Sequence, residues 1–193
     1  MKLTLQRLLI LFAIILLSVA FGFGFDAAAT AIDKKNHPRP QNLEQAVGGN
    51  AQEFGVPEPI LWATIKVQSD FSSNTLSDTG AVGLMQITPE EYDMICREIL
   101  GEDPLDAGIL YDPETNLRVG AAYLSRLYQR YGVWDTVYAA YHAGTDQVDA
   151  WLRDPTCVNN LGMLENIPQK ETQSYVKRMK KAVSTYSKLY YES

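Results

Sequence analysis

Gln68 has the most unusual chemical setting in the sequence. It lies one turn after Ile65 and two turns after Leu61, on the apolar side of a predicted helix, so its amide should point into the domain or into a cleft. A buried, hydrogen-bonded glutamine that supports a neighbouring loop is the ordinary explanation for such a position. A glutamine has nearly the shape of a glutamate and can hydrogen-bond an oxygen, but it exchanges no proton at neutral pH.

A segment with two glycines follows at residues 77–86, with the sequence SDTGAVGLMQ. Glycines, small residues and polar ends suit a loop that brings its backbone close to a ligand. A simple turn has the same composition, and the residues alone leave both interpretations open.

The cysteines and histidines give no sign of a metal centre. Cys96, Cys157, His37 and His142 follow no spacing typical of metal ligands, so neither a metal nor another cofactor is expected. In an oxidising compartment the two cysteines can form one disulfide, and two separate buried thiols are the alternative.

The N-terminal segment predicts entry into a membrane. Two basic residues precede an uncharged stretch at residues 8–25, which approaches the length of a membrane span and exceeds most signal-peptide cores. Positive charge before this stretch and Asp26 after it place the rest of the chain outside. We therefore expect residues 1–29 to be a membrane anchor or a cleaved signal peptide, residues 8–25 to enter the cytoplasmic membrane, and the domain to be extracytoplasmic, either membrane-anchored or secreted.

Charge excludes nucleic acid as the main partner. The formal net charge is −6, whereas binding to a phosphate backbone rests on clustered Lys and Arg. A basic cluster does occur at residues 177–188, but its spacing is typical of the solvated side of a helix.

The remaining pattern is helical. Residues 30–41 are polar and contain prolines, which suits a linker, and residues 42–193 form the predicted domain. Apart from a short extended piece around residues 81–87, no run alternates like a strand, so the predicted fold class is mainly α. Helix signals occur at Pro57, at Thr88 with a stop at Gly101, at Asp112 with a stop at Gly132, at Asp135 with an end near Gly144, and from Tyr175 to Tyr190.

Seven short motifs occur in a fixed order: QSDF at 68–71, SDTG at 77–80, GLMQ at 83–86, AYHAG at 140–144, IP at 167–168, ET at 171–172 and YV at 175–176. In order and spacing they resemble the catalytic domain of the soluble lytic transglycosylases, in the goose-type lysozyme-like superfamily, over about residues 43 to 185. The resemblance implies a lysozyme-like helical domain. It also implies a groove for the peptidoglycan strand of alternating N-acetylglucosamine and N-acetylmuramic acid.

In that family a glutamate at the position of Gln68 protonates the oxygen of the β-1,4 bond between muramic acid and glucosamine. It then acts as base toward the muramic acid C6 hydroxyl, which closes on C1 and gives a 1,6-anhydromuramoyl end. Where the family usually has Asn, this chain has a histidine, which adds a pH-sensitive group or is merely structural. The resemblance implies substrate-binding positions at Ser77, Gln86, Tyr141, His142 and Glu171.

Gln68 departs from the family at the position that carries the chemistry. General acid and general base catalysis are each worth about 10²- to 10⁴-fold, so the chain as written should bind glycan without cleaving it. An engineered Glu→Gln change and a natural loss of catalysis both fit. We favour a lytic transglycosylase with a disabled residue. The alternatives are a natural peptidoglycan-binding or scaffold module of a cell-envelope assembly, and a hydrolytic muramidase.

Overall fold

The computed structural model describes residue 12 and residues 28–192 of the chain. Most of the predicted anchor or signal peptide, residues 1–11 and 13–27, lies outside the described residues. No helix in the described part is both long enough and apolar enough to cross a membrane. The chain divides into two compact units, residues 1–38 and residues 39–193.

In the first unit, residues 28–36 are helical, a feature that the aperiodic sequence of residues 30–41 did not predict. The assignment of this segment as a linker stays a prediction.

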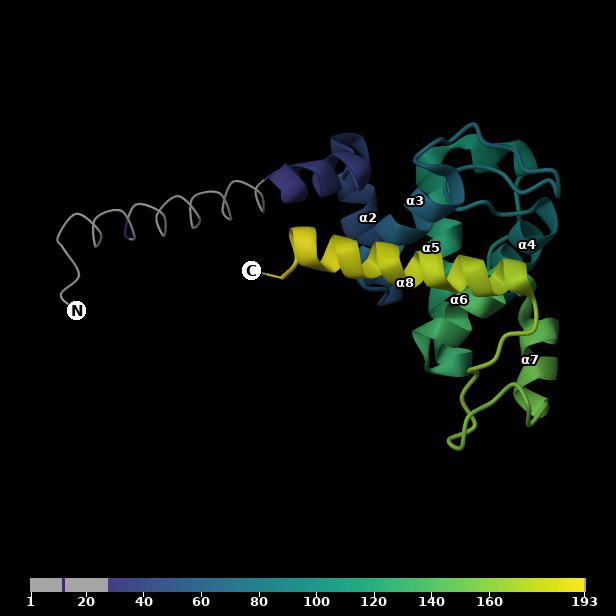
Figure 1. Ribbon diagram of the computed structural model, residues 1–193. Coiled ribbons are helices and arrows are strands. Elements are labelled where there is room, and N and C mark those ends of the chain that lie inside the picture. Colours follow the sequence, from purple (N-terminus) through teal and green to yellow (C-terminus); the bar gives the residue numbers. More distant parts are fainter. Residues whose placement is uncertain (1–11, 13–27, 193) are drawn as a thin grey trace, which may run out of the picture. The chain divides into compact units, whose positions relative to one another are not determined.

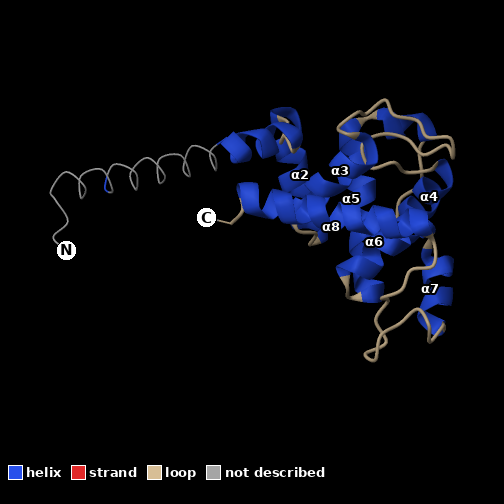
Figure 2. Cartoon of the chain, viewed as in Figure 1, coloured by secondary structure: helices blue, strands red, loops and turns tan. Residues whose placement is uncertain are grey.

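The second unit is built from helices, and within residues 39–192 only isolated β-bridges occur (Figure 2). The fold class is therefore mainly α, as the sequence predicts. The short extended piece is also present, because Val82 forms bridges to Leu76 and Ile87. The helices are α2 (Gln41–Phe54), α3 (Glu58–Ser69), α4 (Pro89–Met94), a π-helical turn (Ile95–Leu100), a 3-10 turn (Ala107–Tyr111), α5 (Pro113–Tyr131), α6 (Trp134–Ala143), α7 (Thr145–Arg153) and α8 (Lys170–Tyr190).

Most helix ends follow the predicted signals. Thr88 forms a capping box with Glu91, and Gly101 and Gly132 end their helices in the left-handed conformation. Asp135 does not cap α6 as predicted, because the helix begins at Trp134 and Asp135 lies in its first turn. Helices α2 and α7 have no counterpart among the predicted elements.

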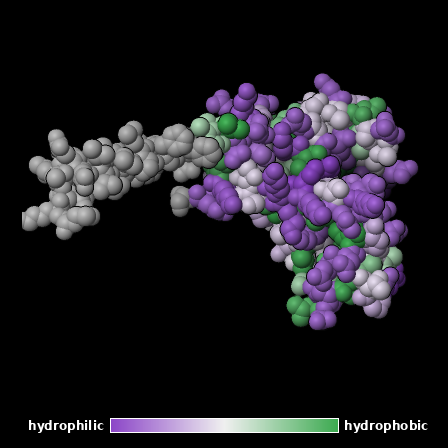
Figure 3. Space-filling view, in the orientation of Figure 1, coloured by the Kyte–Doolittle hydropathy of each residue, from purple (hydrophilic) through white to green (hydrophobic). Residues whose placement is uncertain are grey.

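Helix α8 crosses the domain and packs against α3 and α6 (Figure 1). Its buried side carries Tyr175, Met179 and Tyr186, and the Tyr186 ring stacks on Trp62 of α3 at 6.5 Å between centroids. Its basic residues are exposed, which confirms that the cluster at residues 177–188 is the solvated side of a helix. The face that α8 crosses is accordingly mostly hydrophilic (Figure 3).

Cys96 and Cys157 are both buried and both free. Of the two alternatives that the sequence leaves open, two separate buried thiols describe the structure, and the possible disulfide is not formed. Cys96 lies in the π-helical turn and Cys157 in the loop after α7, and each is packed in the hydrophobic core.

Candidate functional site

Gln68 lies one residue before the end of α3 and is half-buried. Its amide Nε2 donates a hydrogen bond to the Tyr175 hydroxyl at 3.2 Å. Tyr175 lies on α8 and is 2% exposed, so the bond joins two helices that are far apart in sequence. The structure thus gives Gln68 a fixed partner from a second element.

The backbone directly after Gln68 is strained. Asp70 and Phe71 have φ values of 51° and 68°, a left-handed conformation that non-glycine residues rarely adopt. The Ser69 hydroxyl lies 2.9 Å from the Leu84 carbonyl oxygen, to which it can donate, and the Phe71 ring packs against Trp62. Such strain persists only where the surroundings enforce it, and it is common at functional sites.

The loop from residue 75 to residue 87 is held by one buried amide, Asn116 of α5. Its oxygen accepts from the Met85 backbone N–H at 2.7 Å. Its nitrogen donates to the carbonyl oxygens of Val82 and Leu110, at 2.8 and 2.9 Å. A Cβ at Gly83 would lie 2.4 Å from the Asn116 Nδ2, so only glycine allows this approach.

Ser77 and Gln86 both bond within this loop. The Ser77 hydroxyl accepts from the Ala81 backbone N–H at 2.9 Å. The Gln86 amide donates to the carbonyl oxygens of Thr75 and Gly83, at 3.1 and 2.9 Å. These are loop hydrogen bonds, and the substrate-binding roles of Ser77 and Gln86 stay predictions.

Tyr141 connects α6 to the same loop. Its hydroxyl donates to the Met85 carbonyl oxygen at 2.9 Å, and the residue is 8% exposed. Burial raises the pKa of Tyr141 well above its ordinary value, so the hydroxyl keeps its proton and remains a donor. Tyr141 therefore fixes the backbone immediately before Gln86.

His142 lies beside the partner of Gln68. Its ring stacks on Tyr175 at 4.7 Å, and its Nδ1 lies 3.0 Å from the Thr172 hydroxyl oxygen. That hydroxyl donates its own proton to Gln169 at 2.9 Å, so Nδ1–H of His142 is the donor toward it. His142 therefore contacts α8 at two residues, and one of them, Tyr175, is the hydrogen-bond partner of Gln68.

The pKa of His142 lies below its ordinary value. Burial, which disfavours the charged ring, is the largest cause, and the Arg178 guanidinium adds to it. The Glu171 carboxylate acts in the opposite direction. Glu171 itself is exposed in the first turn of α8.

The structure brings some of the predicted site residues into contact with one another and leaves others apart. Gln68, Tyr175 and His142 form one contact chain, and Tyr141 is joined to the neighbouring loop through Met85. Ser77 bonds only within the far end of that loop. Sequence reasoning missed the contact of Tyr175 with Gln68 and the role of Asn116. The only signal for Asn116 was a polar residue beside the apolar stripe of its helix.

Comparison with known proteins agrees with this arrangement of helices and motifs. Residues 45–159 match the Transglycosylase SLT domain family. The soluble lytic murein transglycosylase of Escherichia coli K12 is 32% identical over 128 residues, which are 64% of this chain and 20% of the relative.

Two solved structures have the same fold. The 70 kDa soluble lytic transglycosylase of Escherichia coli superposes with a TM-score of 0.74 at 27% identity, over 83% of this chain and 26% of that one. An inactive mutant of the lytic transglycosylase Slt from Pseudomonas aeruginosa, in which glutamine replaces a glutamate, superposes with a TM-score of 0.70 at 30% identity. That match covers 79% of this chain and 24% of the mutant.

The helical fold and the ordered motifs place the chain in the lysozyme-like class of lytic transglycosylase domains. The chain belongs to the Transglycosylase SLT domain family. It spans about a fifth of the length of the soluble lytic murein transglycosylases that it matches in Escherichia coli and Salmonella typhimurium.

Proposed function

We propose that this chain is a peptidoglycan lytic transglycosylase domain in which Gln68 occupies the position of the catalytic acid and base. As written, it binds wall glycan strands without cutting them. The observation that carries the proposal is the position of Gln68: half-buried at the end of α3, bonded to Tyr175 and followed by a strained turn, in a chain of this family.

A glutamate fits this position without rearrangement. The Tyr175 hydroxyl accepts from the amide of Gln68, and it can instead donate to a carboxylate because a phenol has both capacities. Ile65 and Leu61, one and two turns earlier on α3, are fully buried. Apolar neighbours raise the pKa of a carboxyl group, which keeps the proton that the first step needs.

The reaction requires no second carboxylate. The muramic acid C6 hydroxyl attacks C1 within the same molecule, so it replaces an activated water. A glutamate at position 68 would first give its proton to the leaving oxygen and then take the proton of the C6 hydroxyl. Gln68 does neither. The inactive Pseudomonas aeruginosa relative, with glutamine in place of a glutamate, supports this expectation.

The proposed location is the cell envelope outside the cytoplasm. It rests on the apolar stretch at residues 8–25 and on the nature of the proposed substrate. Whether residues 1–29 anchor the domain or are removed is decided by N-terminal sequencing of the mature protein.

The proposal is tested by restoring the carboxyl group. Gln68→Glu should release soluble fragments from insoluble peptidoglycan at least about 10²-fold faster than the unchanged chain. Gln68→Met, which has similar size and no exchangeable proton, is the matched control and should gain nothing. A Gln68→Glu chain that folds normally and releases no more than the Gln68→Met control would contradict the proposal.

The amide of Gln68 also favours a second candidate, a glycan-binding or scaffold module of an envelope assembly. Its hydrogen bond to Tyr175 is satisfied in the present state, so the site is stable without a carboxyl group. This candidate predicts that both Gln68 and Gln68→Glu forms sediment with peptidoglycan and that neither cuts it.

A further inference from the structure

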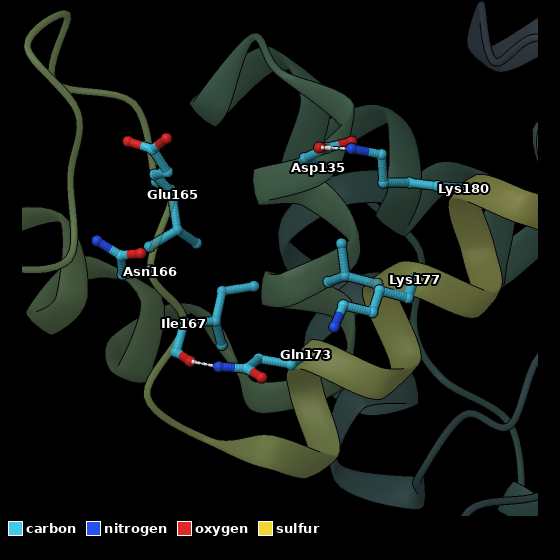
Figure 4. A pocket seen from close by; sticks show the side chains of 9 residues that line it. Asp135, Glu165, Asn166, Ile167, Gln173, Lys177 and Lys180 are labelled. Atoms are coloured by element: carbon cyan, nitrogen blue, oxygen red, sulfur yellow. Dashed lines mark hydrogen bonds and ion pairs between the residues drawn. The ribbon is translucent and has the colours of Figure 1, made fainter.

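A cavity of about 350 Å³ lies between the first turn of α6, α8 and the loop that joins α7 to α8 (Figure 4). Its volume falls within the range of small-ligand sites, about 300 to 1,000 Å³. None of the six predicted site residues lines it. The lining residues are Asp135, Leu164, Glu165, Asn166, Ile167, Gln173, Val176, Lys177 and Lys180.

The loop wall of the cavity is held in place before any ligand binds. The backbone N–H groups of Glu165 and Asn166 both donate to the carbonyl oxygen of Cys157, at 2.9 and 3.0 Å. The Gln173 amide donates to the Ile167 carbonyl oxygen at 2.5 Å, a bond drawn in Figure 4. Because these bonds fix the wall to a buried residue and to α8, little ordering remains for a ligand to impose.

Two opposite charges of the lining have no partner. Lys180 forms an ion pair with Asp135, so these two charges satisfy each other. Within residues 28–192, neither Lys177 nor Glu165 takes part in a side-chain ion pair or hydrogen bond. Lys177 lies on α8 and Glu165 on the facing loop, so a cation and an anion are offered from two sides (Figure 4).

The floor of the cavity is apolar. Ile167 and Val176 are 9% and 7% exposed, and both are aliphatic. No aromatic ring lines the cavity, which disfavours a sugar, because sugars in protein sites commonly stack on aromatic faces. Two carboxylates offset the two lysines, which disfavours a phosphate.

We propose that this cavity binds a short zwitterionic peptide. Its C-terminal carboxylate would pair with Lys177, the ammonium group of a basic side chain would pair with Glu165, and a small apolar side chain would rest on Ile167 and Val176. If the proposed function holds, this ligand is the short peptide attached to the wall glycan, and the present inference rests on it to that extent. The cavity and the candidate site share α8, since Val176 and Lys177 directly follow Tyr175.

The experiment uses the full-length chain in mild detergent and the sugar-free tripeptide N-acetyl-L-Ala-γ-D-Glu-L-Lys, whose acetyl group stands for the amide link to the glycan, with binding measured by calorimetry. The unchanged chain should bind the tripeptide. Lys177→Glu should weaken that binding about tenfold, because a charge-assisted contact becomes a repulsion. Lys181→Glu makes the same charge change on the same helix outside the cavity and should leave the dissociation constant unchanged. Helical circular dichroism confirms that both variants fold.

The inference is overturned if the unchanged chain does not bind the tripeptide, or if the two lysine variants bind it equally well. Its failure is distinguishable from failure of the proposed function, because the latter is read from the release of peptidoglycan fragments by Gln68→Glu. Tripeptide binding without fragment release would contradict the proposed reaction and leave the cavity's ligand intact. Fragment release without tripeptide binding would contradict the ligand proposed for the cavity and support the proposed reaction.

Discussion

The side chain at position 68 differs from a glutamate only in an NH₂ group that replaces one oxygen. That difference changes what the side chain can exchange and hardly changes what it can contact, because the Tyr175 hydroxyl is a suitable partner for either form. The contacts of residue 68 and its capacity for proton exchange can therefore be changed independently. A variant that restores the oxygen tests the chemistry without disturbing the helix.

Tyr141 should contribute to stability through its hydroxyl. Tyr141→Phe removes the donor to the Met85 carbonyl oxygen and leaves that acceptor buried without a partner. We expect the free energy of unfolding to fall by about 1 to 3 kcal/mol, measured by urea denaturation. Tyr128→Phe is the control, since Tyr128 is 40% exposed, and its effect should stay within about 0.5 kcal/mol. Equal effects of the two changes would contradict the role given to Tyr141.

His142 should make stability depend on pH. Because its folded pKa lies below the ordinary value of 6.5, the unfolded chain takes up this proton first as pH falls. The contribution of neutral His142 to the free energy of unfolding is therefore complete above about pH 6.5, and it is lost as pH falls from there toward the folded pKa. Urea denaturation across this range should show the loss, and His142→Gln should abolish that part of the slope.

The neighbours of His142 provide a sign test by NMR titration. Arg178→Gln should raise the pKa of His142, because it removes a repelling cation. Glu171→Gln should lower it, because it removes an attracting anion. Shifts in the same direction for both variants would show that charge is not what these residues contribute.

At the scale of elements, the site depends on how the loop at residues 75–87 is fastened to α5. The Asn116 side chain accepts from the Met85 backbone N–H and donates to the Val82 carbonyl oxygen. It can approach this closely because residue 83 is a glycine. The same loop takes hydrogen bonds from Ser69 and Tyr141. Three helices therefore position the backbone around Gln86, so a change in this loop should be felt at Gln68.

Two glycines of this loop separate packing from backbone strain. Gly83→Ala should lower the free energy of unfolding by about 3 kcal/mol or more, because its Cβ would clash with Asn116 and with the Leu110 carbonyl oxygen. Gly80→Ala carries a similar positive φ but meets nothing within 4 Å, so about 1 kcal/mol is expected. Denaturation of both variants makes the comparison. Similar losses would mean that the approach of Asn116 contributes nothing.

At the scale of the whole molecule, the helices with strong end signals were predictable. Proline, the Thr88 capping box and the terminating glycines act through local backbone chemistry, which the sequence displays directly. Helices α2 and α7 were missed because no cap side chain marks their starts at Pro40 and Gly144. The hydrogen bond between Gln68 and Tyr175 spans 107 positions, and only tertiary packing creates such a contact.

The division into two units predicts the course of proteolysis. Lys34 and Lys35 are exposed and precede the domain that begins at residue 39. Limited trypsin treatment should cut there first and leave a stable fragment that starts near residue 36, identified by mass spectrometry. Equally rapid cuts within α8, whose packed side is buried, would contradict a compact second unit.

The central claim is that position 68 holds the acid and base of a lytic transglycosylase, and mass spectrometry of the Gln68→Glu products tests it most directly. We expect muropeptides with 1,6-anhydro ends, because the C6 hydroxyl replaces water in the reaction. Products heavier by one water would identify a hydrolase instead. The claim is contradicted if the folded Gln68→Glu protein yields only such hydrated ends or no products from purified peptidoglycan.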